Sequence, residues 1–171
     1  MAHPSDIGPA LVALKANAIT VSANGERKVP MEDFFLGPNN FTETILKSVE
    51  FLKAIQIPTQ NDITHQLFLK QRIRHSADFA LSSVAMVAQI SDGICDDMRI
   101  VLGGIAPYPY QALTAEGIVR GERLSEGLVS KAVEASVEDA HPLPMNGYKV
   151  DLTKTLVKRC LMSLKDFVNI D

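Results

Sequence analysis

Two apolar runs in the middle of the chain, Phe79 to Ile90 and Ile94 to Ile105, are separated only by the turn Ser91-Asp92-Gly93. So short a link can join only antiparallel neighbours, because a parallel pair needs a crossover of a dozen or more residues. A third strand-like run, Gln66 to Arg74, precedes them. Pro107 and Pro109 follow them, and prolines lack the N–H that a ladder needs. The sequence therefore predicts a three-stranded antiparallel sheet that ends at these prolines.

The C-terminal third is predicted to be helical. A short helix begins near Thr114, and a second begins at Ser125 and stops at His141-Pro142. The last helix is expected over residues 151–169. Its apolar residues recur at helical spacing, at Leu152, Leu156, Val157, Cys160, Leu161, Leu164 and Val168. Such a face must be buried, so we expect the sheet to pack on a helical bundle.

The first sixty residues predict a smaller unit. Residues 4–16 have the spacing of a short amphipathic helix, with Ser5 or Asp6 as its N-cap. Asn24-Gly25 predicts a hairpin over residues 18–30, and residues 50–57 read as a strand closed by a proline. The polar residues 59–64 that follow are the expected boundary between two domains, 1–60 and 61–171.

Composition excludes several classes of protein. The chain has 171 residues, of which 46% are hydrophobic, and a formal net charge of −3, so it is neither disordered nor generally basic. We expect no nucleic-acid partner. The longest uncharged stretch, Phe79 to Ser91, is too short to span a bilayer, and the first residues lack the layout of a secretory signal. These features predict a cytoplasmic protein without a membrane partner.

No metal site is predicted. The four histidines are scattered, and Cys95 and Cys160 lack the spacing of metal ligands. We expect both cysteines to be reduced structural thiols.

The run from Lys70 to His75 is the most suggestive local feature. On a strand, Lys70, Arg72 and Arg74 would share one face, where three positive charges repel each other unless water or an anion neutralises them. This face is either solvated, or a contact for an anion or cofactor phosphate, or a docking patch for an acidic protein.

Two further features have two interpretations each. Gly103-Gly104 favours a bulge or a close backbone approach over a phosphate cradle, because it lies late in a strand and no helix follows directly. Tyr108 and Tyr110 would be exposed aromatics at the rim of the sheet, acting as core caps or as interface anchors.

Several segments resemble one family, and they occur in the same order as in that family. In the first part they are residues 4–11, 25–30, 33–37 and 54–58, and in the second part residues 70–81, 99–107, 115–116, 146–150 and 157–159. The first set resembles the later part of the FAD-binding domain of molybdenum hydroxylases, which include xanthine dehydrogenase. The second set is similar to the C-terminal domain of the carbon monoxide dehydrogenase flavoprotein. The implied fold is α+β, a partial FAD-binding α/β subdomain followed by that C-terminal domain.

The resemblance implies a role in electron transfer. In this family the flavoprotein subunit holds FAD, receives electrons from iron-sulfur clusters and passes them to an acceptor. The clusters and the molybdopterin belong to partner subunits. Two glycine-rich loops hold the FAD diphosphate, and both lie upstream of the Ser5-Asp6 helix at which this chain begins. We therefore expect an incomplete FAD site, not competent alone. Three explanations are open: the loops belong to the same longer polypeptide, they are supplied by a separate chain, or the protein is degenerate.

Three residues match family contacts to FAD. Asp6 matches an acidic residue close to the hydroxyl-bearing chain of the cofactor, although it is equally a candidate helix cap. Leu52 matches an apolar contact. Lys70 matches a basic residue near the flavin, where a positive charge favours reduced, anionic flavin. Two alternatives remain: a docking module for the iron-sulfur or molybdenum subunit, based on the basic run and the tyrosines, and an α+β fragment without activity.

Overall fold

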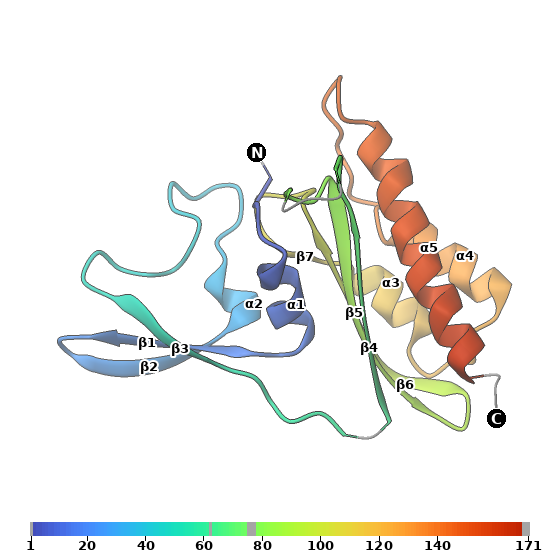
Figure 1. Ribbon diagram of the computed structural model, residues 1–171, viewed down its shortest axis with the longest axis horizontal. Helices are drawn as coiled ribbons and strands as arrows, with labels where there is room; N and C mark the ends of the chain where they lie inside the picture. Colours follow the sequence, from blue (N-terminus) through green and yellow to red (C-terminus); the bar gives the residue numbers. More distant parts are fainter. Residues whose placement is uncertain (1, 62, 75–77, 169–171) are drawn as a thin grey trace.

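The computed structural model describes residues 2–61, 63–74 and 78–168. Within these residues the strands form two antiparallel sheets, one of order β2-β1-β3 and one of order β4-β5-β6-β7. The first sheet projects to one side of the molecule, and the second stands at its centre (Figure 1). The expected α+β fold is confirmed at this level.

The helix, hairpin and strand predicted in the first sixty residues are present, although the helix is shorter than the predicted residues 4–16. Helix α1 covers Ile7–Ala13 and helix α2 covers Met31–Phe34. Strands β1 (Asn17–Ser22) and β2 (Gly25–Pro30) form the predicted hairpin, and β3 (Phe51–Gln56) pairs with the other edge of β1. Gly25 has a φ of 111°, which explains why the Asn-Gly turn signal was informative here.

The central sheet is a meander, as predicted, but it has a fourth strand. Its strands are β4 (Thr64–Gln71), β5 (Ser82–Ser91), β6 (Ile94–Gly103) and β7 (Tyr110–Gln111). The prediction that the sheet ends at the prolines was wrong. Both prolines lie in the loop between β6 and β7, outside the ladder, and the chain then returns to pair Tyr110 with Leu102.

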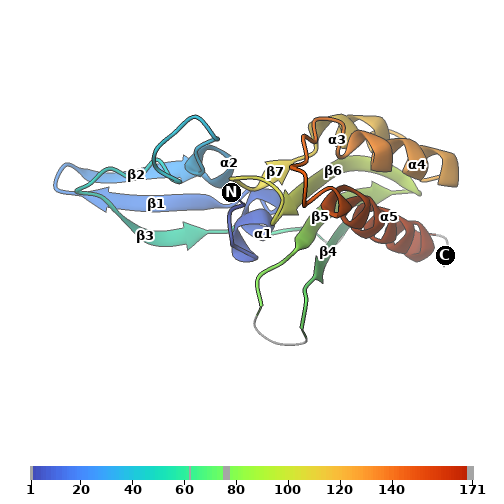
Figure 2. The ribbon, with the colours of Figure 1, turned by 90° about the horizontal axis from the view of Figure 1, so that it is seen from above.

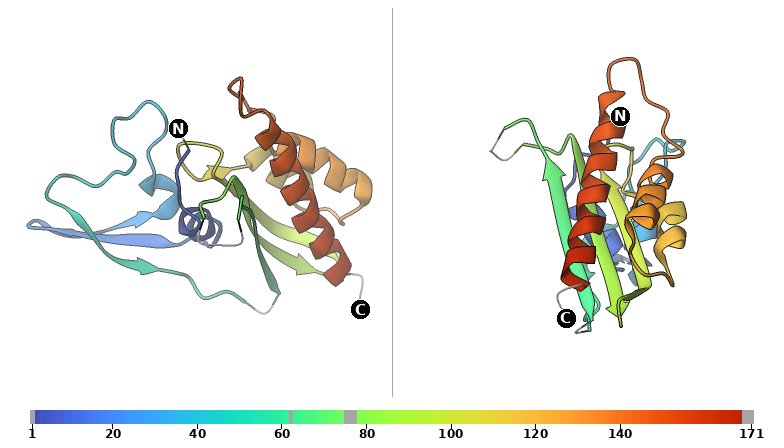
Figure 3. Two further views of the ribbon diagram at one scale, coloured as in Figure 1. Left: turned by 45° about the horizontal axis from the view of Figure 1, so that its top comes forward. Right: turned by 90° about the vertical axis from the view of Figure 1, so that its right-hand side faces the viewer.

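Three helices cover one face of the central sheet (Figure 3). They are α3 (Leu113–Val119), α4 (Glu126–Ala135) and α5 (Tyr148–Val168). Ser125 caps α4 as predicted, its Oγ accepting from the N–H of Leu128 at 3.2 Å. Most of the predicted apolar face of α5 is buried, at Leu156, Val157, Cys160, Leu161 and Leu164. The side chain of Val168, and all of Asn169, lie outside the described residues.

The opposite face of the central sheet is covered by α1 (Figure 2). Leu11 and Val12 of α1 share a hydrophobic core with Ala85 of β5 and Val101 of β6. Both faces of β5 are therefore buried, which explains why its sequence is almost continuously apolar. The expected division into domains 1–60 and 61–171 remains a prediction, since this core includes residues from both.

No helix among the described residues combines the length and apolar character needed to cross a membrane.

Candidate functional site

Asp6 and Lys70, two of the three residues that the resemblance singled out, contact each other. The Nζ of Lys70, near the end of β4, donates to Oδ2 of Asp6, just before α1, at 2.5 Å. The Lys70 side chain is 17% exposed and that of Asp6 is 38% exposed. The pair therefore lies at the surface, with its acidic member more open to a ligand than its basic one.

Ser5 leaves the Asp6 carboxylate available for this contact. The Oγ of Ser5 accepts a hydrogen bond from the N–H of Gly8 at 2.9 Å, whereas the Asp6 side chain makes no capping bond. The side chain of Asp6 therefore does not cap α1, and the helix-cap interpretation of this residue is removed. Among the described residues, Oδ1 of Asp6 accepts no hydrogen bond, so it can accept one from a ligand hydroxyl.

The predicted basic face does not form. Strand β4 ends at Gln71, so Arg72 and Arg74 are not on the strand with Lys70. Arg74 instead makes a bidentate contact with Asp78, with both N–O distances at 2.9 Å. Two of the three charges are neutralised by carboxylates of this chain, Lys70 by Asp6 and Arg74 by Asp78. The docking interpretation therefore loses its main support.

Gly103-Gly104 is a close backbone approach, as predicted. A Cβ on Gly103 would stand 2.4 Å from Oγ of Ser83 and 2.6 Å from Cγ of Pro9. Gly104 has a φ of 74°, and a Cβ there would stand 2.7 Å from the carbonyl oxygen of Ala80. Protein atoms already occupy the Cβ side of both glycines, which supports the close backbone approach over the phosphate cradle.

Leu52, the third expected contact, lies apart from the other two, on β3 of the small sheet. It pairs with Thr20 of β1 and is 39% exposed. The structure therefore brings together two of the three candidate residues. Whether any of the three contacts FAD stays a prediction.

A network that the sequence did not predict fixes the start of β3. Oε1 and Oε2 of Glu50 accept from Nε and Nη2 of Arg27 at 2.5 Å and 2.7 Å, and Oε1 also accepts from Oγ1 of Thr20 at 2.6 Å. These hydrogen bonds lower the pKa of the Glu50 carboxyl to about 2, with the Arg27 contact as the largest cause. The network connects the hairpin to the strand that carries Leu52.

The cysteines and the tyrosines lie where their side chains contribute to packing. Cys95 and Cys160 are buried free thiols, and burial raises their pKa to about 11 and about 12. Tyr110 caps the main core, and Tyr108 is half-buried rather than exposed. Among the described residues no cluster of side chains could hold a metal ion.

Two family models match the chain in tandem. Residues 68–164 match the CO dehydrogenase flavoprotein C-terminal domain, and residues 1–60 match the FAD binding domain in molybdopterin dehydrogenase. The chain belongs to the CO dehydrogenase flavoprotein family. Asp6 lies in the first matched segment and Lys70 in the second, so their contact joins the two segments.

Curated relatives support this assignment. The glyceraldehyde dehydrogenase medium chain of Sulfolobus acidocaldarius is 34% identical over 73% of this chain and 43% of its own length. The carbon monoxide dehydrogenase medium chain of Hydrogenophaga pseudoflava is 28% identical over 93% of this chain and 56% of its own. The chain spans about half the length of these two relatives.

Solved structures share the fold. Carbon monoxide dehydrogenase from Hydrogenophaga pseudoflava has a TM-score of 0.81 at 29% identity, over 91% of this chain and 56% of that one. Quinoline 2-oxidoreductase from Pseudomonas putida 86 has a TM-score of 0.80 at 27% identity, over 98% of this chain and 59% of that one. The family's fold thus extends over both sheets of the chain.

Proposed function

We propose that this chain forms part of the FAD site of a molybdenum hydroxylase flavoprotein subunit, with Asp6, Lys70 and Leu52 as its contacts to FAD. The observation that carries the proposal is the ion pair between Asp6 and Lys70. It joins a segment that matches an FAD binding domain to a segment that matches a flavoprotein C-terminal domain. A cofactor that both segments contact would bind at such a junction.

The chemistry of the residues fits part of FAD. Oδ1 of Asp6 is an open carboxylate acceptor, suited to a hydroxyl of the ribityl chain. The ammonium of Lys70 lies beside it and would place a positive charge near the flavin ring. Leu52 would offer an exposed apolar surface. When bound, FAD would supply the relay of electrons from iron-sulfur clusters to an acceptor.

The FAD diphosphate requires other residues. Such a group is usually held by backbone N–H groups of glycine-rich loops at a helix N-terminus. Protein atoms already occupy the Cβ side of Gly103 and Gly104, and α1 has only seven residues. We infer that the two glycine loops of the family complete the site from outside these residues, in the same polypeptide or in a separate one. Iron-sulfur and molybdenum subunits are the proposed further partners.

Reconstitution tests this proposal. The chain is mixed with a polypeptide that carries the two glycine loops and with FAD, and the mixture is separated by gel filtration. We expect flavin absorbance to co-migrate with the chain, and to fall strongly with Asp6→Asn or Lys70→Met. Lys154→Met is the matched control, because Lys154 pairs with Glu134 on the helical side. A colourless protein peak at micromolar concentration would count against the proposal.

A further inference from the structure

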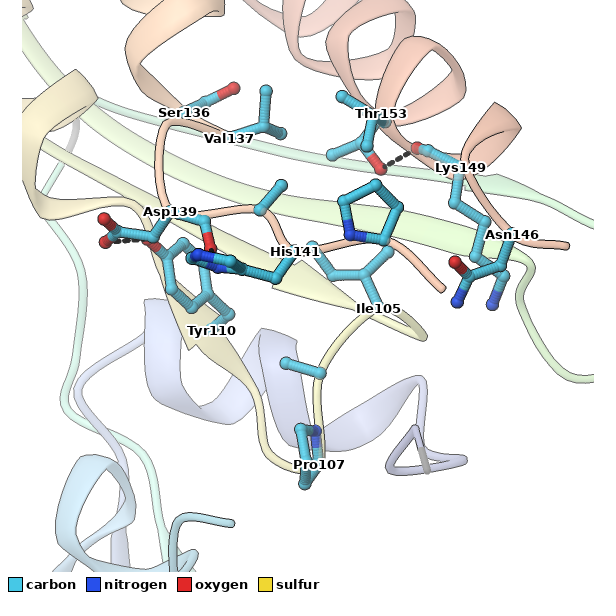
Figure 4. A pocket seen from close by; sticks show the side chains of 14 residues that line it. Ile105, Pro107, Tyr110, Ser136, Val137, Asp139, His141, Asn146, Lys149 and Thr153 are labelled. Atoms are coloured by element: carbon cyan, nitrogen blue, oxygen red, sulfur yellow. Dashed lines mark hydrogen bonds between the residues drawn. The ribbon is translucent and has the colours of Figure 1, made fainter. Parts of the chain in front are cut away.

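The helix-covered side of the molecule has a pocket that the proposed function does not use (Figure 4). It has a volume of about 190 Å³ and is lined by the loop between β6 and β7, the segment between α4 and α5, and the first turns of α5. Helix α1, which Asp6 immediately precedes, lies on the other face of the sheet (Figure 1). A ligand here would therefore be distinct from the flavin.

Size limits what this pocket can hold. An apolar cavity of about 150 Å³ accommodates benzene, whereas sites for drug-sized ligands begin at about 300 Å³. A volume of about 190 Å³ lies between the two and suits a ring or a pair of fused rings. Ile105, Val137 and Ala140 give the pocket apolar walls against which a flat ring can pack.

Polar groups at one end of the pocket define the ligand further. Among the described residues, Oδ1 of Asn146 is buried and has no hydrogen-bond partner, and it points into the pocket (Figure 4). Lys149 also lines the pocket, and its Nζ donates to the carbonyl oxygen of Gly104 at 2.8 Å. An ammonium has three N–H donors, so Lys149 keeps donors for a ligand. The pocket thus presents both an acceptor and a donor.

This pair discriminates between classes of ligand. A carboxylate would suit Lys149 but would set a second acceptor against Oδ1 of Asn146. A cation would suit Asn146 but would be repelled by Lys149. A cyclic amide carries an N–H beside a carbonyl oxygen on a rigid ring, so it satisfies both residues with little loss of conformational entropy.

At the other end of the pocket, the Tyr110 hydroxyl donates to Oδ2 of Asp139 at 3.1 Å. Burial and the neighbouring Asp139 raise the pKa of Tyr110 to about 12, so the phenol stays protonated at neutral pH. The hydroxyl and the carboxylate at this end of the pocket therefore already form a hydrogen bond with each other. The ligand needs polar groups only where it faces Asn146 and Lys149.

We propose that this pocket binds a small flat cyclic amide, whose N–H donates to Oδ1 of Asn146 and whose carbonyl oxygen accepts from Nζ of Lys149, with the ring between Ile105 and Val137. The site is separate from the proposed flavin contacts.

A titration of the full ¹⁵N-labelled chain with 2-quinolinone, in the absence of FAD, tests the proposal. We expect saturable changes in the amide signals of Ile105, Val137 and Lys149. The matched control is 1-methyl-2-quinolinone, which keeps the rings and the carbonyl oxygen but lacks the N–H. It should bind about tenfold more weakly or worse, because it leaves Oδ1 of Asn146 without a donor. Equal affinity for the two compounds would overturn the proposal, as would changes centred on Lys70.

Two variants keep the test informative. Asn146→Ala should lower the affinity for 2-quinolinone about tenfold and remove the preference over 1-methyl-2-quinolinone. Ala140→Trp should block the pocket while leaving the fold intact, because Ala140 is exposed. If both variants bind 2-quinolinone like the unaltered chain, the pocket is not the site.

A titration without saturable changes would mean that Asn146 is satisfied by water alone, and it would also refute the proposal. Neither result would bear on FAD binding, which is measured separately.

Discussion

Pro9 of α1 packs directly against Gly103 of β6: a Cβ on Gly103 would stand 2.6 Å from Cγ of Pro9. This contact sets how closely α1 approaches the central sheet. Asp6 immediately precedes α1, and Lys70 lies on β4 of the same sheet. The absence of a side chain at Gly103 therefore contributes to bringing the two candidate flavin contacts within 2.5 Å of each other.

Gly103→Ala should lower the free energy of unfolding by about 2 kcal/mol, because the added methyl group meets both Pro9 and Ser83. Gly117→Ala is the matched control. Gly117 lies in α3, and a Cβ there meets nothing within 4 Å. The control should stabilise the protein by about 0.5–1 kcal/mol, since alanine favours helix over glycine. Urea unfolding measures both effects, and a neutral Gly103→Ala would contradict the close approach.

Glu50 should make stability fall in acid. Its pKa is depressed from 4.5 to about 2, so its contribution is complete above pH 4.5 and is lost as the pH falls through 2. Glu50→Gln should therefore lower Tm at neutral pH, and the difference from the unaltered chain should shrink towards pH 2. Glu134→Gln, which removes a mostly exposed carboxylate, should change Tm little at neutral pH. A Tm difference for Glu50→Gln that stays constant from pH 7 to 2 would refute the role of Arg27 as its partner.

The first sixty residues should unfold together with the central sheet, because α1 shares a core with β5 and β6. Leu11→Ala should cost about 2–3 kcal/mol, and circular dichroism and hydrogen exchange should still report one transition. Leu113→Ala, at a residue 66% exposed, should change stability by less than about 0.5 kcal/mol. Separate melting of the small sheet would instead support independent domains.

Both cysteines should resist labelling in the folded protein. With pKa values of about 11 and about 12, on the order of one thiol in ten thousand or fewer is a thiolate at pH 7. Burial also blocks access to the sulfur atoms. A thiol reagent such as DTNB should react with the two cysteines only after denaturation. Rapid stoichiometric labelling of the native chain would show that a thiol is accessible.

Local signals predicted most of the fold. The Asn24-Gly25 turn, the Ser91-Asp92-Gly93 turn and the helical spacing of the last segment each act over a few residues, and each is confirmed. Strand β7 was missed for the same reason. The prolines before it argue against a strand locally, whereas its pairing with β6 depends on the path of the chain after them.

The candidate site required information that no local pattern contains. Asp6 and Lys70 are 64 positions apart, and Arg27 and Glu50 are 23 apart. The sequence placed Lys70 with Arg72 and Arg74 because the strand was expected to continue, but the strand ends at Gln71. The pocket at Asn146 joins segments from β6 to α5, so it became visible only in the structure.

The affinity for FAD of the reconstituted mixture, measured for Asp6→Asn, Lys70→Met and the control Lys154→Met, tests the central claim most directly. We expect the first two variants to weaken FAD binding about tenfold or more, and Lys70→Met also to make the potential of the bound flavin more negative by about 30 mV, since a nearby positive charge is lost. The control should match the unaltered chain. Unchanged affinity and potential in both variants would contradict the claim that Asp6 and Lys70 contact FAD.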